Sequence, residues 1–583
     1  MAVVCGKMKM LLLALSMMVV LATATSRFPM TTPGWKLDPT ETRTIPTSSG
    51  YLQGARYTRT TPSPTPSSEH AVWAFLGVPF AAPPVGALRW REPQAVDPTM
   101  AGETYDATMF GPSCVQFPSP EVPSSVMSED CLYLNVYVPE SVLDTAGGAP
   151  SPVMEYIYGG SFVSGSSSKQ DINGLNLTSS SSAIVVTLNY RLGPFGFLAS
   201  PPSLAVDGST GNYGLLDQRA AMAWVESNIA AFGGDKDAIT LFGESAGAIS
   251  VCYHLVWHRN VEHSLFSRAI LQSPDCDSGT PLQVALEQGK AFASATGCST
   301  SHGDPKEQLE CMRALSSHDV LTALPLAPFG DPNGASYGGV IDGDVVKAQP
   351  NAELASQGVE QDLPVVLGTC AESCTLFVMP NEVERNMNES TLHAMLGALW
   401  PPPIVAKILD TYPLSAYPLV PPASAWAHML SDYVFHCPTR TTASVLADGN
   451  ARAHLYVYDH TPTCDAFPQA LHKYLGAYHY ADVPATFGNP PLTPPEPCQW
   501  SPGDNVVSAQ MQSLWTDFAF AKDPAPASVW PPYSTSSRPV LFISPSSRLS
   551  HNYEEVFCHL WDTIPPPGGY LSHAHARSTF RSS

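Results

Sequence analysis

The sequence predicts an α/β fold in which a large, mostly parallel, doubly wound sheet is flanked by helices. Short β-branched and aromatic runs alternate with a stretch whose apolar residues have helical spacing, which is typical of such sheets. One of these runs, 183–189, is almost entirely apolar, as expected of a strand buried on both faces. Hydrophobic residues make up 44% of the 583 residues and charged residues 14%, so the chain can form a large core.

The individual elements follow from local composition. Apolar spacing predicts a helix over 214–232, a short buried strand over 238–242, and helical structure again over 248–255. Because proline cannot donate to a sheet ladder, we expect an exposed connection at 60–68 and a long surface loop at 484–502. The other strand-like runs cover 48–58, 70–78, 132–138 and 153–158.

Residues 1–24 have the parts of a secretory signal peptide. Lys7 and Lys9 precede an apolar run over 10–21, and small residues follow at 22–24. An uncleaved membrane anchor is the alternative, but the apolar run is too short to span a bilayer comfortably. We therefore expect a secreted, extracellular protein in an oxidising compartment, with no integral membrane anchor.

Charge and composition restrict the remaining classes. The formal net charge of −22 disfavours nucleic acid and anionic membranes as partners, and solubility is its simplest explanation.

Twelve of the thirteen cysteines follow the predicted signal peptide. Twelve cysteines in so long a chain are too dilute for a disulfide scaffold and fit a few bridges on a self-sufficient core. Asn176 and Asn388 begin short glycosylation sequons. The sequence does not predict an oligomeric state.

A nucleophile motif follows the predicted strand 238–242. Gly243-Glu244-Ser245-Ala246-Gly247 is a G-x-S-x-G sequence, and helical sequence comes directly after it. Between a strand and a helix this motif forms a strained turn that exposes the serine hydroxyl, with glycines where a side chain would collide with neighbours. A chance match is the alternative, but the position between strand and helix favours Ser245 as a nucleophile.

The residues around this motif resemble the type-B carboxylesterase and cholinesterase family of the α/β-hydrolase superfamily. The resemblance implies the α/β-hydrolase fold, one domain over 28–565, a flexible tail over 566–583, and no cofactor or metal. It also implies a serine carboxylic-ester hydrolase that forms an acyl-enzyme from a small-molecule or lipid ester. The matching segments are 75–90, 128–135, 211–218, 224–229, 232–235, 242–247, 340–343, 431–433 and 515–531.

The resemblance also assigns the general base and the oxyanion hole. Seventeen histidines are present, and the segment 476–484 is similar to the family's catalytic-histidine segment, which points to His479. The backbone N–H groups of Gly160, Ser161 and Ala246 are expected to bind the oxyanion. Ser161 stands where the family has a third glycine, so its side chain is expected to narrow the site.

The segment that should carry the acid of the triad departs from the family's pattern. The family carries a glutamate in a stretch resembling 368–377, and a gapless reading places Ser373 at that position. A slip of one residue would give the role to Glu372, which we select because the next carboxylate is Glu382.

Three cysteine pairs fall on positions that resemble bridges of the family. Cys464 and Cys498 flank the His479 segment and can pair with each other, whereas Cys252 is interpreted as a small buried hydrophobe. Cys276, Cys370 and Cys374 are left unassigned. The three pairs implied by the resemblance are Cys114 with Cys131, Cys298 with Cys311, and Cys437 with Cys558.

The sequence favours uncharged esters as substrates. Cholinesterases hold a quaternary ammonium against a tryptophan just before the Ser-Glu-Asp-Cys signature, whereas this chain has Phe117 and no tryptophan between Cys114 and Cys131. The competing hypothesis is a weakly active or non-catalytic adhesion or binding member of the family. Ser245 and His479 favour an enzyme, whereas Ser161 and the irregular acid loop keep the alternative open.

Overall fold

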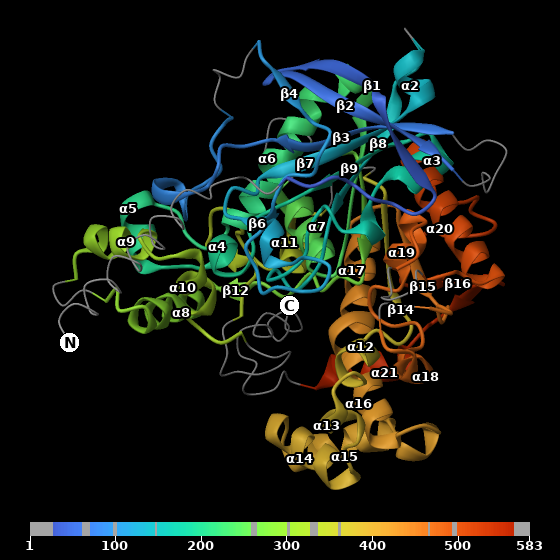
Figure 1. Cartoon of the computed structure of the whole chain (residues 1–583). Helices are drawn as coiled ribbons and strands as arrows, with labels where there is room; N and C mark the ends of the chain where they lie inside the picture. Colours follow the sequence, from blue (N-terminus) through green and yellow to red (C-terminus); the bar gives the residue numbers. More distant parts are fainter. Residues whose placement is uncertain are drawn as a thin grey trace, which may run out of the picture.

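The computed structural model describes residues 27–60, 70–96, 102–145, 148–257, 265–299, 303–326, 336–358, 363–464, 467–491 and 498–564 (Figure 1). A single large sheet runs through the molecule, and a short strand, β4 (Thr104–Asp106), pairs with its second strand. In spatial order the sheet consists of β1 (Trp35–Thr47), β2 (Gly50–Arg59), β3 (Ala71–Pro79), β7 (Tyr133–Pro139), β9 (Ile184–Leu188), β8 (Ser151–Ile157), β10 (Gly234–Glu244), β11 (Arg268–Gln272), β14 (Val365–Cys370), β15 (Ala453–Tyr458), β16 (Pro539–Ile543) and β17 (Arg548–His551).

The sheet is mixed, with a parallel centre. All neighbouring pairs from β9 to β16 are parallel, whereas the pairs from β1 to β9 and the final β16–β17 pair are antiparallel. Two residues, 48–49, join β1 to β2, and so short a link permits only a hairpin. The expected parallel, doubly wound arrangement therefore describes the centre of the sheet, and the N-terminal strands add an antiparallel extension.

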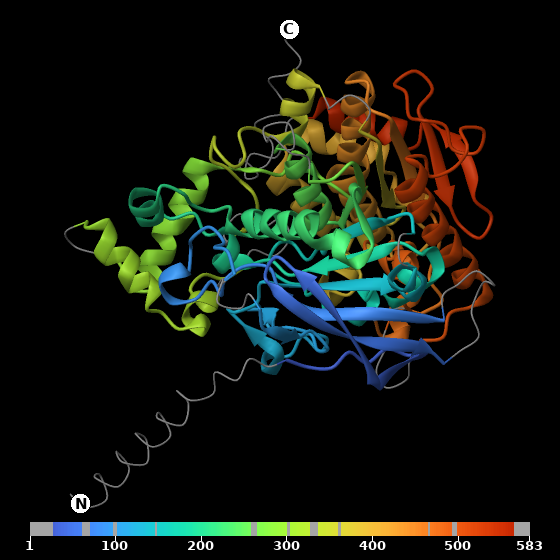
Figure 2. The same ribbon diagram turned by 90° about the horizontal axis from the view of Figure 1, so that it is seen from above.

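Helices cover both faces of the sheet, which confirms the predicted fold class. Every residue of β8, β9 and β11 is buried, so these strands form the middle layer. Contacts between helices and strands place one set of helices on each face of the sheet (Figures 1 and 2). On one face lie α6 (Tyr213–Asn228), α7 (Ala246–Trp257), α11 (Pro350–Gln357) and α17 (Cys437–Asp448), and on the other α3 (Leu175–Ser181) and α20 (Pro502–Ala521).

Most predicted elements coincide with observed ones. The proline-rich segment 484–502, predicted as a loop, differs at its start. Residues 484–487 belong to α19 (Asp482–Phe487) instead of a loop. Pro484 lies in the first turn of this helix, where the missing N–H needs no acceptor within the helix. The predicted signal peptide, the C-terminal tail and most of the connection 60–68 lie outside the described residues.

Five disulfide bridges join described parts of the chain. Cys252 on α7 bonds to Cys276, so its interpretation as an unpaired hydrophobe was wrong: the end of β11 brings Cys276 against that helix. Cys370 and Cys374 are buried and free. In the part of the chain that is described, no helix is long and apolar enough to cross a membrane. The remaining bridges are Cys114–Cys131, Cys298–Cys311, Cys437–Cys558 and Cys464–Cys498.

The two sequons differ in their surroundings. The side-chain amide of Asn176 donates to the Gly488 carbonyl and to the Asn489 side chain, both at 2.8 Å. A glycan replaces one of the two hydrogens on that nitrogen and would remove at least one of these bonds, so the folded structure does not favour glycosylation at Asn176. Asn388 is exposed, and its oxygen caps helix α14 (Glu389–Leu399) while its nitrogen is left free of the cap. Asn388 is therefore the sequon that remains a candidate.

A buried carboxyl in the middle of the sheet makes stability depend on pH. Glu155 on β8 is fully buried, and neither of its side-chain oxygens has a hydrogen-bond partner among the described residues. Burial raises its pKa to about 8. The unfolded chain releases this proton near pH 4.5, so between about pH 4.5 and pH 8 the unfolded state binds fewer protons and the folded state loses stability as the pH rises.

We expect Glu155→Gln to stabilise the protein more at pH 8 than at pH 5. The raised pKa of Glu155 lowers the free energy of unfolding by an amount on the order of 5 kcal/mol near pH 8 and by only a small amount near pH 5. The variant cannot ionise and therefore removes this loss. Thermal unfolding at both pH values measures the difference. Glu389→Gln, on the exposed face of α14, serves as the control. An equal change in melting temperature at the two pH values would contradict the assignment.

Candidate active site

Ser245 occupies a sharp turn between β10 and α7. Its φ angle is 54°, a left-handed conformation that non-glycine residues seldom adopt, and its N–H donates to the carbonyl of Gln272 on the next strand at 2.8 Å. A Cβ atom on Gly243 would lie 2.6 Å from the Gly247 carbonyl, and one on Gly247 would lie 2.0 Å from the Ile157 carbonyl oxygen. The two glycines are therefore required by packing, and the turn leaves Ser245 partly exposed.

The segment that follows β8 lies directly against this turn. A Cβ on Gly159 would come within 2.6 Å of Glu244 and 2.9 Å of the Ser245 Cβ. Gly160 and Ser161 both have positive φ angles, of 109° and 54°, which turns successive backbone amides toward one side.

The amides in this region are available to a ligand. Among the hydrogen bonds of the described chain, the N–H groups of Gly160, Ser161 and Ala246 have no acceptor. Unpaired N–H groups beside a candidate nucleophile are what an oxyanion hole requires. The Ser161 side chain is exposed at this site.

His479 is packed into the same region from the C-terminal part of the chain. Its ring stacks on Phe435, with centroids 4.3 Å apart, and lies 5.5 Å from Phe377. Its Nε2 is 3.0 Å from Oε1 of Glu244, the residue before Ser245. This contact is close but poorly aligned, and in the described structure no hydrogen bond joins the ring to Ser245. The histidine is thus adjacent to the nucleophile turn, and the Glu244 carboxyl lies against its ring.

Burial controls the ionisation of both groups. Desolvation lowers the pKa of His479 to about 3 and raises the pKa of Glu244 well above its usual range. His479 is therefore neutral near physiological pH, which is the form that accepts a proton. An imidazolium formed 3.0 Å from Glu244 would favour the ionised carboxylate, because an opposite charge at this distance stabilises the charged form.

Glu372 does not lie against His479. Its Oε2 accepts a hydrogen bond from the Ala477 N–H at 2.7 Å, and its own N–H donates to the Ala477 carbonyl at 3.0 Å. No ion pair connects Glu372 to His479 within the described residues. The carboxylate is already bonded to backbone on the outer side of the loop, which explains why it does not reach the ring.

Ser373 is the residue of this loop whose backbone bonds to His479 itself. It is fully buried, its carbonyl accepts from the His479 N–H at 3.1 Å, and its hydroxyl donates to the Cys370 carbonyl at 2.8 Å. Ser373 thus contacts His479 through its backbone while its hydroxyl bonds to Cys370, so in the described structure neither Glu372 nor Ser373 presents its side chain to the ring. Sequence reasoning gave Glu244 no role toward the histidine, and only its position next to Ser245 could have suggested one.

The sequence profile of the carboxylesterase family matches residues 41–561. The chain belongs to this family, and it is a carboxylic ester hydrolase by class. Among its relatives, a para-nitrobenzyl esterase from Bacillus subtilis (strain 168) is 31% identical over 498 residues, which cover 84% of this chain and 94% of that protein. An acetylcholinesterase from Bungarus fasciatus is 30% identical over 526 residues, which cover 85% of this chain and 83% of that protein.

Proposed function

We propose that this protein is a secreted serine esterase that hydrolyses uncharged carboxylic esters through an acyl-enzyme. The observation that carries the proposal is the strained Ser245 turn beside three unpaired backbone amides. A hydroxyl held in this way needs only a base and an oxyanion site to attack an ester carbonyl. The five disulfides support a location in an oxidising compartment, as the basic and apolar N-terminal segment predicts.

In the proposed reaction, neutral His479 takes the proton of Ser245 while the hydroxyl oxygen attacks the carbonyl carbon. The negative charge on the former carbonyl oxygen is received by the amides of Gly160, Ser161 and Ala246. Collapse of the intermediate expels the alcohol, which takes the proton from His479. Water then attacks the acyl-enzyme by the same route, which releases the acid and restores Ser245.

We further propose a division of roles among the acidic residues. Glu244 is the carboxyl that compensates the imidazolium, because it lies 3.0 Å from the ring. Glu372 is a positioning residue: its paired bonds to Ala477 hold the backbone two residues before His479. Gly476 is needed at this contact, since a Cβ there would lie 2.9 Å from the Glu372 carboxyl.

The competing function is protein binding by a body that has lost efficient catalysis. Two observations favour it: Ser373 at the gapless acid position, and the lack of a Ser245–His479 hydrogen bond in the described structure. Pre-steady-state hydrolysis of p-nitrophenyl acetate separates the two. An enzyme is expected to release a burst of one p-nitrophenolate per active site followed by turnover. A protein with neither burst nor turnover would be the binding member.

We expect neutral esters to be better substrates than choline esters. Phe117, which is 44% exposed, lies in the segment where the resemblance to cholinesterases implies a tryptophan platform, and no tryptophan stands between Cys114 and Cys131. The sharpest comparison uses acetylcholine and 3,3-dimethylbutyl acetate, which differ in the charged nitrogen and not in shape. The neutral ester should have the higher kcat/KM. Equal or reversed values would mean that other aromatic residues form a cation site.

A further inference from the structure

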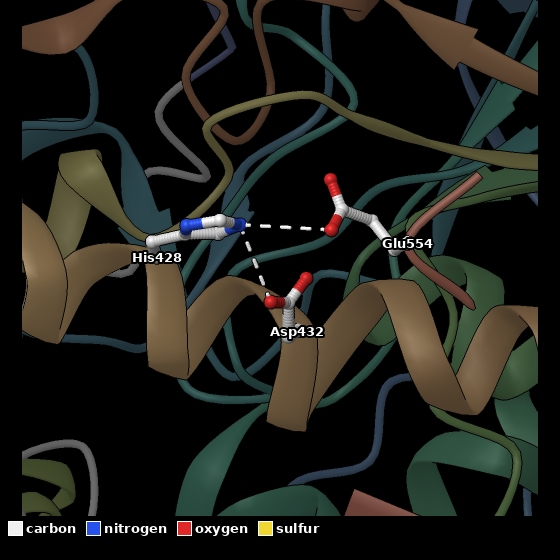
Figure 3. Close-up of side chains that lie close together, drawn as sticks. All are labelled: His428, Asp432 and Glu554. Atoms are coloured by element: carbon white, nitrogen blue, oxygen red, sulfur yellow. Dashed lines mark ion pairs between the residues drawn. The ribbon is translucent and has the colours of Figure 1, made fainter. Parts of the chain in front are cut away.

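A separate cluster of polar side chains lies between two elements far apart in the sequence. His428 is on α16 (Pro421–Ser431), and Asp432 begins the π-helical turn η8 (Asp432–His436) that continues into α17. Glu554 precedes α21 (Glu555–Thr563), near the C-terminus of the described chain. Figure 3 shows Nε2 of His428 facing the carboxylates of both acidic residues.

The three atoms of this cluster are close enough to one another to bind a single cation. Nε2 of His428 is 3.3 Å from Oδ2 of Asp432 and 3.7 Å from Oε2 of Glu554, and the three atoms lie within 4.8 Å of one another. Charge-assisted hydrogen bonds between such groups are usually about 2.7–2.9 Å long. Ligands of a tetrahedral zinc ion with bonds of about 2.0–2.1 Å are separated by about 3.3–3.4 Å.

The neighbouring groups orient these three atoms. Nδ1 of His428 is 2.8 Å from the Tyr417 hydroxyl, so Nδ1–H can donate to that oxygen and leave the Nε2 lone pair free. Asp432 accepts at Oδ2 from the Tyr412 hydroxyl at 2.7 Å and is bonded at Oδ1 to His436 at 2.8 Å. Each carboxylate oxygen has two lone pairs, so Oδ2 retains one for a ligand.

Glu554 supplies the observation that a ligand would explain. Its Oε2 is buried and lies 3.7 Å from Nε2 of His428, farther than a hydrogen bond, and the carboxyl also interacts with the Tyr553 side chain. A buried, unsatisfied carboxylate oxygen is unfavourable unless a cation or a donor meets it. The side chain of His428 is 25% exposed, which provides a path from solvent to the cluster.

We propose that His428, Asp432 and Glu554 bind a tetrahedral divalent cation of the zinc class, with water as the fourth ligand. One imidazole and two carboxylates are a ligand set that zinc accepts, whereas calcium prefers six or more oxygens and magnesium a rigid octahedron. The site joins α16 and η8 to the start of α21, two regions that the Cys437–Cys558 bridge also connects. Its role is therefore to fasten α21 to η8, the turn whose Phe435 stacks on His479.

The test is metal binding by the purified, chelator-treated protein. One Zn²⁺ per chain is expected by calorimetry, and Co²⁺ at the same site is expected to give the visible absorption bands of tetrahedral coordination. His428→Gln and Glu554→Gln should each weaken Zn²⁺ binding by more than the roughly 10- to 100-fold that loss of an outer-shell partner costs. Zn²⁺ should also raise the melting temperature of the wild type and not of the variants.

The control is His393→Gln. His393 and Glu389 form an exposed pair on α14. They are 3.7 Å apart, like His428 and Glu554, and four residues apart, like His428 and Asp432. No second carboxylate pairs with His393 in the described chain. This variant should keep full binding. Unchanged Zn²⁺ affinity in His428→Gln and Glu554→Gln would overturn the proposal, as would equal affinity for Ca²⁺, which indicates an acidic patch. Thiolate charge-transfer bands in the Co²⁺ spectrum would overturn it in favour of Cys370 and Cys374.

Discussion

Ser245→Ala is expected to abolish ester hydrolysis, with kcat reduced by at least about 10⁴-fold. In subtilisin, loss of the nucleophilic serine reduces kcat by about 10⁶, and the residual rate comes from the oxyanion site and substrate binding. The same residual groups remain here, because Gly160 and Ala246 are untouched. The measurement is the steady-state rate with p-nitrophenyl acetate.

A control variant and a stability measurement accompany this experiment. Ser444→Ala, on helix α17, changes a half-buried serine far from the turn in sequence and is expected to leave the rate unchanged. The melting temperature of Ser245→Ala should stay close to that of the wild type, since the hydroxyl makes no hydrogen bond in the described structure. A variant that kept most of its activity would remove Ser245 from the mechanism.

Glu244→Gln is expected to have the largest effect among the candidate acidic residues. The amide keeps the shape of the side chain and removes the charge that stabilises the imidazolium of His479, and an analogous change in a serine protease reduces turnover by about 10⁴. Glu372→Gln should cost much less, because the amide oxygen can still accept from the Ala477 N–H. All variants are compared by kcat/KM on one neutral ester.

The same experiment separates the alternatives that the sequence left open. A large loss confined to Glu372→Gln would assign the acid to Glu372 and mean that the loop moves during catalysis. A large loss confined to Ser373→Ala would show that the Ser373 hydroxyl supports the histidine without charge. The pH profile is a second readout: the acidic limb should shift in Glu244→Gln and stay in place when only the backbone contacts of the loop are altered.

The strands around the nucleophile could be predicted from the sequence because burial leaves an unbroken apolar pattern. The predicted strand 183–189 corresponds to β9, and the G-x-S-x-G glycines lie where a Cβ would collide with Ile157 or Gly247. These features depend on residues close together in the chain. Strand direction in the N-terminal part did not follow from composition: β3 is almost entirely buried, like β8 and β9, which are parallel to each other, yet it pairs antiparallel with both of its neighbours.

The long-range contacts of the site were beyond sequence reasoning. Glu244 and Glu372 are both carboxylates in family-like segments, and only the folded chain shows which one approaches the ring of His479. The pairing of Cys252 with Cys276 likewise depends on how α7 packs beside β11. A one-residue slip in the acid loop changes the assignment completely, and no local pattern distinguishes the two registers.

Covalent labelling with a fluorophosphonate tests the central claim most directly. The probe phosphonylates an activated serine, and the adduct resembles the tetrahedral intermediate that the oxyanion amides are proposed to bind. We predict one label per chain, located by peptide mass spectrometry on Ser245, and no label in Ser245→Ala. A wild-type protein that remains unlabelled, or one labelled on a different serine, would contradict the proposed active site.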